Sequence, residues 1–140
     1  MRTVRDESGE TYLLVTESSD ACKVRDPETG EERFRDRETL ELVDGESPLA
    51  ATARAVPEPV RRVLTAAPDE RALGLLVELH ERGPHSVRYL LDATDLCESD
   101  LLGVLTEFRA AGLVAEATVA GERGYATTEA ADDGLAALLD

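Results

Sequence analysis

The clearest periodic pattern of hydrophobic and polar positions lies in the second half of the chain. Within the segments 69–82 and 98–111, apolar residues recur three, four and seven positions apart, which is the spacing of one face of an α-helix. These apolar positions are Ala72, Leu75, Leu76 and Leu79 in the first segment and Leu101, Val104, Leu105 and Phe108 in the second. Asp69 favours the start of the first helix as an N-cap, and Gly112 favours the end of the second. The pattern therefore predicts two amphipathic helices.

Shorter elements are predicted between and after these two helices. Ser86 is a suitable N-cap for a short helix, which a turn separates from the second amphipathic helix. Residues 113–119 and 125–127 are β-prone runs on either side of a turn at 120–124, which predicts a β-hairpin. A last helix follows the N-cap Thr128. Its narrow apolar stripe consists of Ala131, Leu135, Leu138 and Leu139.

The first half of the chain predicts β-structure followed by short helices. Turn-forming residues separate short β-prone runs at 3–5, 11–16, 21–25 and 31–34. Residues 37–43 fit either a last strand or a short helix, and the proline-interrupted segment that follows fits two short helices. We therefore expect a β-meander over residues 1–45, a helical connector over 46–68 and a further domain over 69–140. A meander of this size buries little apolar surface, so we expect it to pack on the next domain or on a protein partner.

Charge changes the picture, because the 140 residues carry 30 acidic and 15 basic side chains and a net charge of −15. Lys23 is the only lysine among the basic residues. Acid-rich, lysine-poor proteins of this kind resemble those of halophilic archaea, which implies that the charge serves solubility in molar salt. The alternative is an acidic surface for a basic partner. Residues 49–82 are the least acidic stretch, and their basic residues are Arg54, Arg61, Arg62, Arg71 and Arg82.

The sequence predicts a cytoplasmic protein without a cofactor. No apolar run reaches the roughly 18 residues of a membrane helix, and the chain is charged from Arg2 onward, unlike a signal peptide. Cys22 and Cys97 are expected to be reduced thiols, and His80 and His85 lack further ligands at metal-site spacing. No nucleophile with a base and no glycine-rich phosphate loop stands out, so we expect no catalysis and no bound metal.

The order helix, helix, turn, helix, hairpin resembles the winged helix-turn-helix domain of MarR- and ArsR-type regulators of archaea and bacteria. The resemblance covers residues 69–139. Three segments carry it, namely Ser86 to Leu101, Phe108 to Val114 and the hairpin that ends at Tyr125. It implies an α+β fold with an N-terminal β-meander followed by a winged helix-turn-helix domain. It also implies a DNA-binding transcriptional regulator that forms a homodimer, since the terminal helices of such proteins often make the dimer interface.

In these regulators the third helix enters the major groove and the hairpin wing, here around residues 121–124, touches the DNA backbone. Carried over by position, the outward face of the third helix consists of Ser99, Gly103, Thr106 and Ala110. The double-stranded DNA contacts implied are Arg88, Ser99, Gly103, Thr106, Arg109 and Arg123. The chain departs from the family pattern, because this face has no Arg, Lys, Asn or Gln to form bidentate hydrogen bonds with bases. Asp100 and Glu107 flank the face and would repel phosphates.

The small side chains of this face have a second interpretation, because they allow the close approach of another helix or of a partner surface. Some winged helices are protein-interaction modules, so a module that does not read DNA is the alternative function. Cys97, at the predicted start of the third helix, is either a reactive thiol or a substitute for the usual cap residue. The N-terminal domain could serve a ligand, a protein partner or the dimer, and its sequence does not choose among them.

Overall fold

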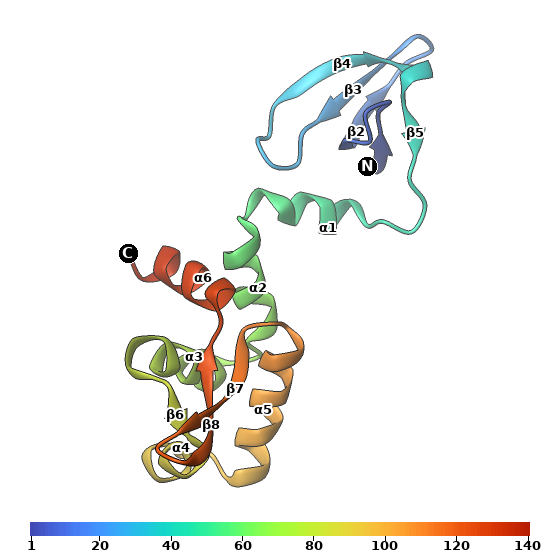
Figure 1. Cartoon of the computed structure of the whole chain (residues 1–140). Helices are drawn as coiled ribbons and strands as arrows, with labels where there is room; N and C mark the ends of the chain where they lie inside the picture. Colours follow the sequence, from blue (N-terminus) through green and yellow to red (C-terminus); the bar gives the residue numbers. More distant parts are fainter. The chain divides into compact units, whose positions relative to one another are not determined.

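The computed structural model describes all of residues 1–140, and its mixture of helices and antiparallel sheets confirms the expected α+β class (Figure 1). The chain divides into two compact units, Met1–Pro57 and Glu58–Asp140, hereafter the N-terminal and C-terminal units. The division falls inside the segment 46–68, which the sequence had suggested as a separate connector. None of the helices combines the length and the apolar character needed to cross a membrane.

The N-terminal unit is built on a five-stranded antiparallel sheet with the order β4-β3-β2-β1-β5. Its strands are β1 (Arg2–Arg5), β2 (Thr11–Glu17), β3 (Ala21–Arg25), β4 (Glu32–Asp36) and β5 (Glu41–Leu42). The first four strands form the predicted meander. The segment 37–43 contains both structures that its sequence allowed, because the 3₁₀ helix η1 (Arg37–Thr39) precedes β5. In β5, Leu42 returns to pair with Val4 of β1.

One face of this sheet forms the hydrophobic core of the N-terminal unit. Strand alternation places Val4, Tyr12, Cys22 and Val24 there, and each is at least nine-tenths buried. Leu40, which follows η1, packs against this cluster. The guanidinium groups of two arginines in β4, Arg33 and Arg35, lie 5.8 and 5.7 Å from the centre of the Tyr12 ring. The core of the unit is therefore small and partly closed by arginine side chains.

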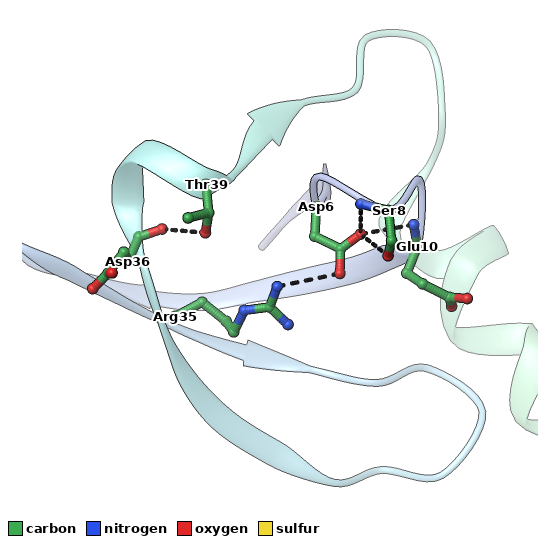
Figure 2. A network of polar contacts seen from close by, with 6 residues as sticks. All are labelled: Asp6, Ser8, Glu10, Arg35, Asp36 and Thr39. Carbon is green, nitrogen blue, oxygen red and sulfur yellow. Dashed lines mark hydrogen bonds and ion pairs between the residues drawn. The ribbon is translucent and has the colours of Figure 1, made fainter.

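A polar network around Asp6 ties the turn after β1 to β4 (Figure 2). One carboxylate oxygen of Asp6 accepts hydrogen bonds from the backbone N–H and hydroxyl of Ser8 and from the backbone N–H of Glu10. The other oxygen lies 3.3 Å from the Arg35 guanidinium. The hydrogen bond from the Ser8 hydroxyl lowers the pKa of Asp6 most, and the backbone N–H groups of Glu10 and Ser8 and then the charge of Arg35 lower it further. The Arg35 side chain therefore links β4 to the turn after β1, although β2 and β3 lie between these two strands in the sheet.

The segment 46–68 is shared between the two units. Its first helix, α1 (Pro48–Thr52), is capped by Ser47 and continues into the 3₁₀ helix η2 (Ala53–Ala55). The methyl group of Ala51 is fully buried within the N-terminal unit, where α1 packs against β1 and β2. The second helix, α2 (Glu58–Ala66), buries Val63 in the core of the C-terminal unit. Each helix therefore belongs to the unit that buries its apolar side.

The C-terminal unit contains five helices and a three-stranded antiparallel sheet with the order β6-β8-β7. After α2, its elements are α3 (Glu70–Arg82), β6 (His85–Ser86), α4 (Val87–Ala93), α5 (Glu98–Ala110), β7 (Val114–Val119), β8 (Glu122–Thr127) and α6 (Glu129–Leu139). The sequence did not predict β6, because two residues are too few to show a strand period. The helices occur where the hydrophobic pattern placed them, and β7 and β8 form the predicted hairpin with a shorter turn.

Side-chain caps and a leucine-rich core fix these helices. The predicted N-caps Asp69, Ser86 and Thr128 each accept a hydrogen bond from a backbone N–H in the first turn of the helix that follows. The predicted apolar faces of α3 and α5 meet in one core. Its fully buried side chains include Leu76, Leu79, Leu90, Leu101, Leu105, Phe108, Leu113 and Leu135.

The hairpin of β7 and β8 is tighter than predicted. The sequence suggested a turn over residues 120–124, but only Ala120 and Gly121 form the loop, with φ angles of 51° and 80°. Two positive φ angles suit the primed turns that match the twist of a two-residue hairpin. Arg123 consequently lies within β8, opposite Thr118, and not in the loop.

Candidate functional site

The exposed face of α5 carries the four small residues singled out in the sequence. Ser99, Gly103, Thr106 and Ala110 are all exposed, while the opposite face of the helix lies in the core. The Thr106 hydroxyl donates a hydrogen bond to the carbonyl of Leu102 at 2.7 Å, within the same helix. The face therefore offers a partner a shallow surface with few free hydrogen-bonding groups.

Carboxylates flank this face. Glu98, Asp100 and Glu107 are exposed on α5, and no arginine forms an ion pair with any of them. Arg109, the only basic residue of the helix, lies 3.3 Å from Glu116 of β7. The negative charge on α5 is consequently uncompensated, whereas its positive charge is paired.

The three arginines expected to contact phosphate all have glutamate partners. Arg88 in α4 lies 3.4 Å from Glu122, and Arg109 and Arg123 lie 3.3 and 3.2 Å from the same oxygen of Glu116. All three arginine side chains remain more than half exposed. Exposed pairs of this kind contribute about 0–1 kcal/mol each, so an anionic ligand could replace the glutamates at modest cost.

Arg123 is the most firmly held of the three. Its guanidinium donates a hydrogen bond to the Tyr125 hydroxyl at 2.8 Å and lies 5.7 Å from the centre of that ring. Tyr125, followed by Glu116, raises the pKa of Arg123. Because residues i and i+2 of a strand share a face, the register of β8 places these two side chains together.

Two hollows open beside α5 and α3. The first, of about 460 Å³, lies between the start of α3 and the exposed face of α5 and includes Ser99 and Gly103. The second, of about 410 Å³, lies between α3 and α4 and includes Gly74 and Tyr89. Both are lined by Arg71 and Leu96, which therefore stand between them. Sequence reasoning placed Ser99 and Gly103 on an exposed face but could not show that this face is hollowed.

Arg71, which lines both hollows, forms an ion pair with Asp95 of the second hollow. Its Nε lies 3.5 Å from the Asp95 carboxylate, and its guanidinium also donates a hydrogen bond to the Asp95 carbonyl at 3.4 Å. The remaining charged residues of the first hollow are Asp69, Asp100 and Glu107. Since Arg71 is already paired, the surface of this hollow is acidic.

Comparison with known families gives one match, which spans both units. Residues 1–139 match the family described as "Family of unknown function (DUF7346)". The chain belongs to this family. A search of curated proteins and a search of solved structures found no match.

The two histidines of this DUF7346 chain each face one carboxylate. His80 Nδ1 lies 2.8 Å from Asp132 of α6, which also accepts a hydrogen bond from Thr127 at 2.7 Å. His85 Nε2 lies 3.0 Å from Glu78. Burial raises the pKa of Asp132, but hydrogen bonds from His80 and Thr127 outweigh it and lower that pKa overall. No three His, Cys, Asp or Glu side chains gather where they could hold a metal ion.

The two cysteines are separate free thiols. Cys22 is buried in the N-terminal sheet, and Cys97 is exposed at the N-cap position of α5. The Cys97 sulfur makes no capping hydrogen bond and lies 3.5 Å from the Ser99 hydroxyl. Cys97 thus occupies the position of a cap residue without its usual hydrogen bond.

Proposed function

We propose that the C-terminal unit of this DUF7346 protein is a winged helix-turn-helix domain. The order of its elements supports this assignment, because α3, α4 and α5 supply three helices and β7 and β8 supply a wing after the third (Figure 1). The short strand β6 also supports it, since it precedes α4 and pairs with β8 to complete a small sheet beside the helices. In this arrangement α5 is the helix in the recognition position.

The function that we propose for this domain is protein binding, without catalysis and without the reading of DNA bases. The observation that carries the proposal is the exposed face of α5, which combines small side chains with the unpaired carboxylates of Asp100 and Glu107. A good bidentate contact to a base contributes roughly 1–3 kcal/mol of discrimination, and no side chain on this face can form one. A carboxylate about 4 Å from a phosphate costs roughly 1 kcal/mol even in water. The same face is open to a protein surface.

A paired binding experiment tests this function. The wild-type chain and an Asp100→Lys/Glu107→Lys variant are compared for binding to a pool of genomic duplex fragments and to proteins captured from an extract of the native cells. We expect no selective DNA binding by the wild type, and a captured protein that, made separately, binds the wild type but not the variant. The control is Glu129→Lys/Asp133→Lys, which makes the same charge change at exposed positions of α6. Selective binding of duplex fragments by the wild type would contradict the proposal.

DNA binding is the second candidate, supported by the shared ion pair at the base of the wing. Glu116 neutralises only one of the two arginines beside it, Arg109 and Arg123, so this point keeps a net positive charge. A homodimeric regulator could place two such points on the phosphates of a palindromic site. The test is a triple variant in which Arg88, Arg109 and Arg123 become Ala. The experiment is carried out in molar potassium chloride, because the composition is acid-rich and lysine-poor. The second candidate requires that the wild type bind selected fragments under this condition and that the triple variant lose this binding.

A further inference from the structure

Small and apolar residues make up part of the lining of the hollow between α3 and α5. They include Ala72 of α3, Gly103 and Val104 of α5, and Leu96 in the preceding turn. The neighbouring hollow, beyond Arg71, includes Gly74 of α3. The two hollows adjoin at Arg71 and Leu96 and are hereafter called the α3 groove, and each half of it includes a helical glycine.

The fold itself does not require either glycine. A β-carbon on Gly103 or Gly74 would meet no other atom within 4 Å, and neither residue has a positive φ angle. Glycine in the middle of a helix lowers helix stability relative to alanine. By contrast, a β-carbon on Gly124 or Gly134 would lie 2.4 Å from a backbone oxygen, so internal packing explains those two glycines. The presence of glycine at positions 103 and 74 is explained if another molecule packs closely against the helix at these two positions.

The charge of the α3 groove indicates which class of molecule can bind there. Asp69, Asp100 and Glu107 line the larger half of the groove, and its one basic side chain, Arg71, is paired with Asp95. A second copy of this chain would bring its own net charge of −15 to an acidic surface. Duplex DNA would bring phosphates to the same carboxylates. A positively charged partner is the one that the groove attracts.

The shape of the groove indicates which part of a positively charged partner fits it. Small residues along a helix allow a second helix to approach at the short end of the usual interaxial range, about 8 Å. The lining of the α3 groove has small residues on both α3 and α5, and it also includes the apolar side chains of Leu96 and Val104. An amphipathic helix could place its apolar side there and its basic side chains against the acidic rim.

We propose that the α3 groove is the docking site for a basic amphipathic helix of a partner protein. This inference rests on the proposed protein-binding function and specifies the partner by its chemistry. The helix lies along the glycines, with lysine or arginine side chains paired to Asp69, Asp100 and Glu107.

The test uses the full-length chain, labelled with ¹⁵N, and two synthetic peptides of about 15 residues, long enough to form a helix. One peptide is an amphipathic sequence of Lys, Arg, Leu and Ala, and the other has Glu in place of each Lys and Arg. We expect the basic peptide to shift the amide resonances of Gly103 and Gly74, and the acidic peptide to shift neither. Gly103→Leu, which fills the groove, should weaken binding of the basic peptide at least about tenfold.

Matched variants separate groove filling from general effects. Ala137→Leu places a leucine side chain at an exposed position of α6, away from both the groove and the exposed face of α5, and should leave the affinity unchanged. Asp100→Lys/Glu107→Lys should weaken binding at least about tenfold, while Glu129→Lys/Asp133→Lys should have a much smaller effect. The circular dichroism of each variant confirms its folding. Failure of the basic peptide to bind, unchanged affinity in Gly103→Leu, or equal binding of the acidic peptide overturns the inference.

The inference and the proposed function can fail separately. If a native partner binds the wild type and Gly103→Leu leaves that affinity unchanged, the domain binds protein through another face and the groove inference alone is wrong. If the wild type selects DNA through α5 while the basic peptide still requires an open groove, the proposed function alone is wrong.

Discussion

Gly134 in α6 lies so close to Pro59 in α2 that a β-carbon on it would come within 2.4 Å of the Pro59 carbonyl oxygen. The two helices form an extensive contact within the C-terminal unit, and Val63 of α2 is fully buried beside it. The last helix is therefore held by backbone packing as well as by Leu135, whereas Leu138 and Leu139 at its end are exposed.

The different surroundings of Gly134 and Gly103 predict opposite effects for alanine substitutions at these two positions. Gly134→Ala should destabilise the C-terminal unit by about 1–3 kcal/mol, because the new methyl group overpacks a contact with backbone atoms. Gly103→Ala should stabilise the same unit by about 0.5–1 kcal/mol, because its methyl group meets nothing and the helix gains propensity. Amide hydrogen exchange of core residues in α2 and α6 measures both changes. Equal effects of the two substitutions would contradict this account of helix packing.

Asp132 predicts a pH-dependent contribution to stability. Hydrogen bonds from His80 and Thr127 lower its pKa in the folded state below the ordinary value of 3.8. The stabilisation is therefore fully present above the unfolded pKa and is lost as the pH falls through the lower, folded pKa. Asp132→Asn should cost about 0.5–1 kcal/mol at pH 7, because the side chain is nearly half exposed and solvent screens the interaction.

Denaturant unfolding at neutral pH and at pH values below 3.8 tests this prediction. The difference between Asp132→Asn and the wild type should shrink in acid. Asp133→Asn is the matched control, since Asp133 is exposed on the same helix and has no ion pair. A difference that is independent of pH would show that the carboxylate charge is not involved.

Asp6 gives the corresponding prediction for the N-terminal unit. Asp6→Asn should lower the unfolding temperature of this unit, because the amide loses the charge that faces Arg35 and one oxygen that accepts hydrogen bonds. Since the pKa of Asp6 is lowered in the folded state, this stabilisation should also be lost in acid. The amide resonances of Ser8 and Glu10, followed during thermal unfolding, report on the turn directly. Glu7→Gln, on the exposed side of the same turn, is the control.

Glu116→Gln should release Arg109 and Arg123 together. If these arginines can contact phosphate, the variant should bind duplex DNA more tightly than the wild type, with a salt dependence steeper by about one to two units of slope. Fluorescence anisotropy across a series of potassium chloride concentrations measures that slope. Glu129→Gln removes one negative charge on α6 and controls for net charge. An unchanged slope would argue against the second candidate function.

Strong local patterns predicted the helices of the C-terminal unit. The apolar spacing and the caps Asp69 and Thr128 are properties of short segments, and the structure contains both α3 and α6 where they indicated. The strand β6 and the β1–β5 pairing escaped prediction, because each involves only two residues and depends on a distant partner. Local sequence does not encode such pairings.

The candidate site was only partly predictable for the same reason. Ser99 and Gly103 could be assigned to the exposed face of α5 from helical spacing alone. The pairing of Arg109 and Arg123 with Glu116 depends on the register of the hairpin and on the position of α5 beside β7. The hollow beside Arg71 depends on how α3 and α5 cross. The number of charges along the chain predicts neither the ion pairs of Glu116 nor the hollow beside Arg71.

The edge strand β4 carries its own protection against aggregation. Phe34 is 72% exposed on this strand, whose outer backbone groups have no neighbouring strand. If two molecules paired through β4 with Phe34 opposite Phe34, Arg33 would face Arg35 and Glu32 would face Asp36. Like charges directly opposite each other destabilise antiparallel pairs. The like charges on either side of Phe34 therefore disfavour pairing of two β4 strands in the register that would place Phe34 opposite Phe34.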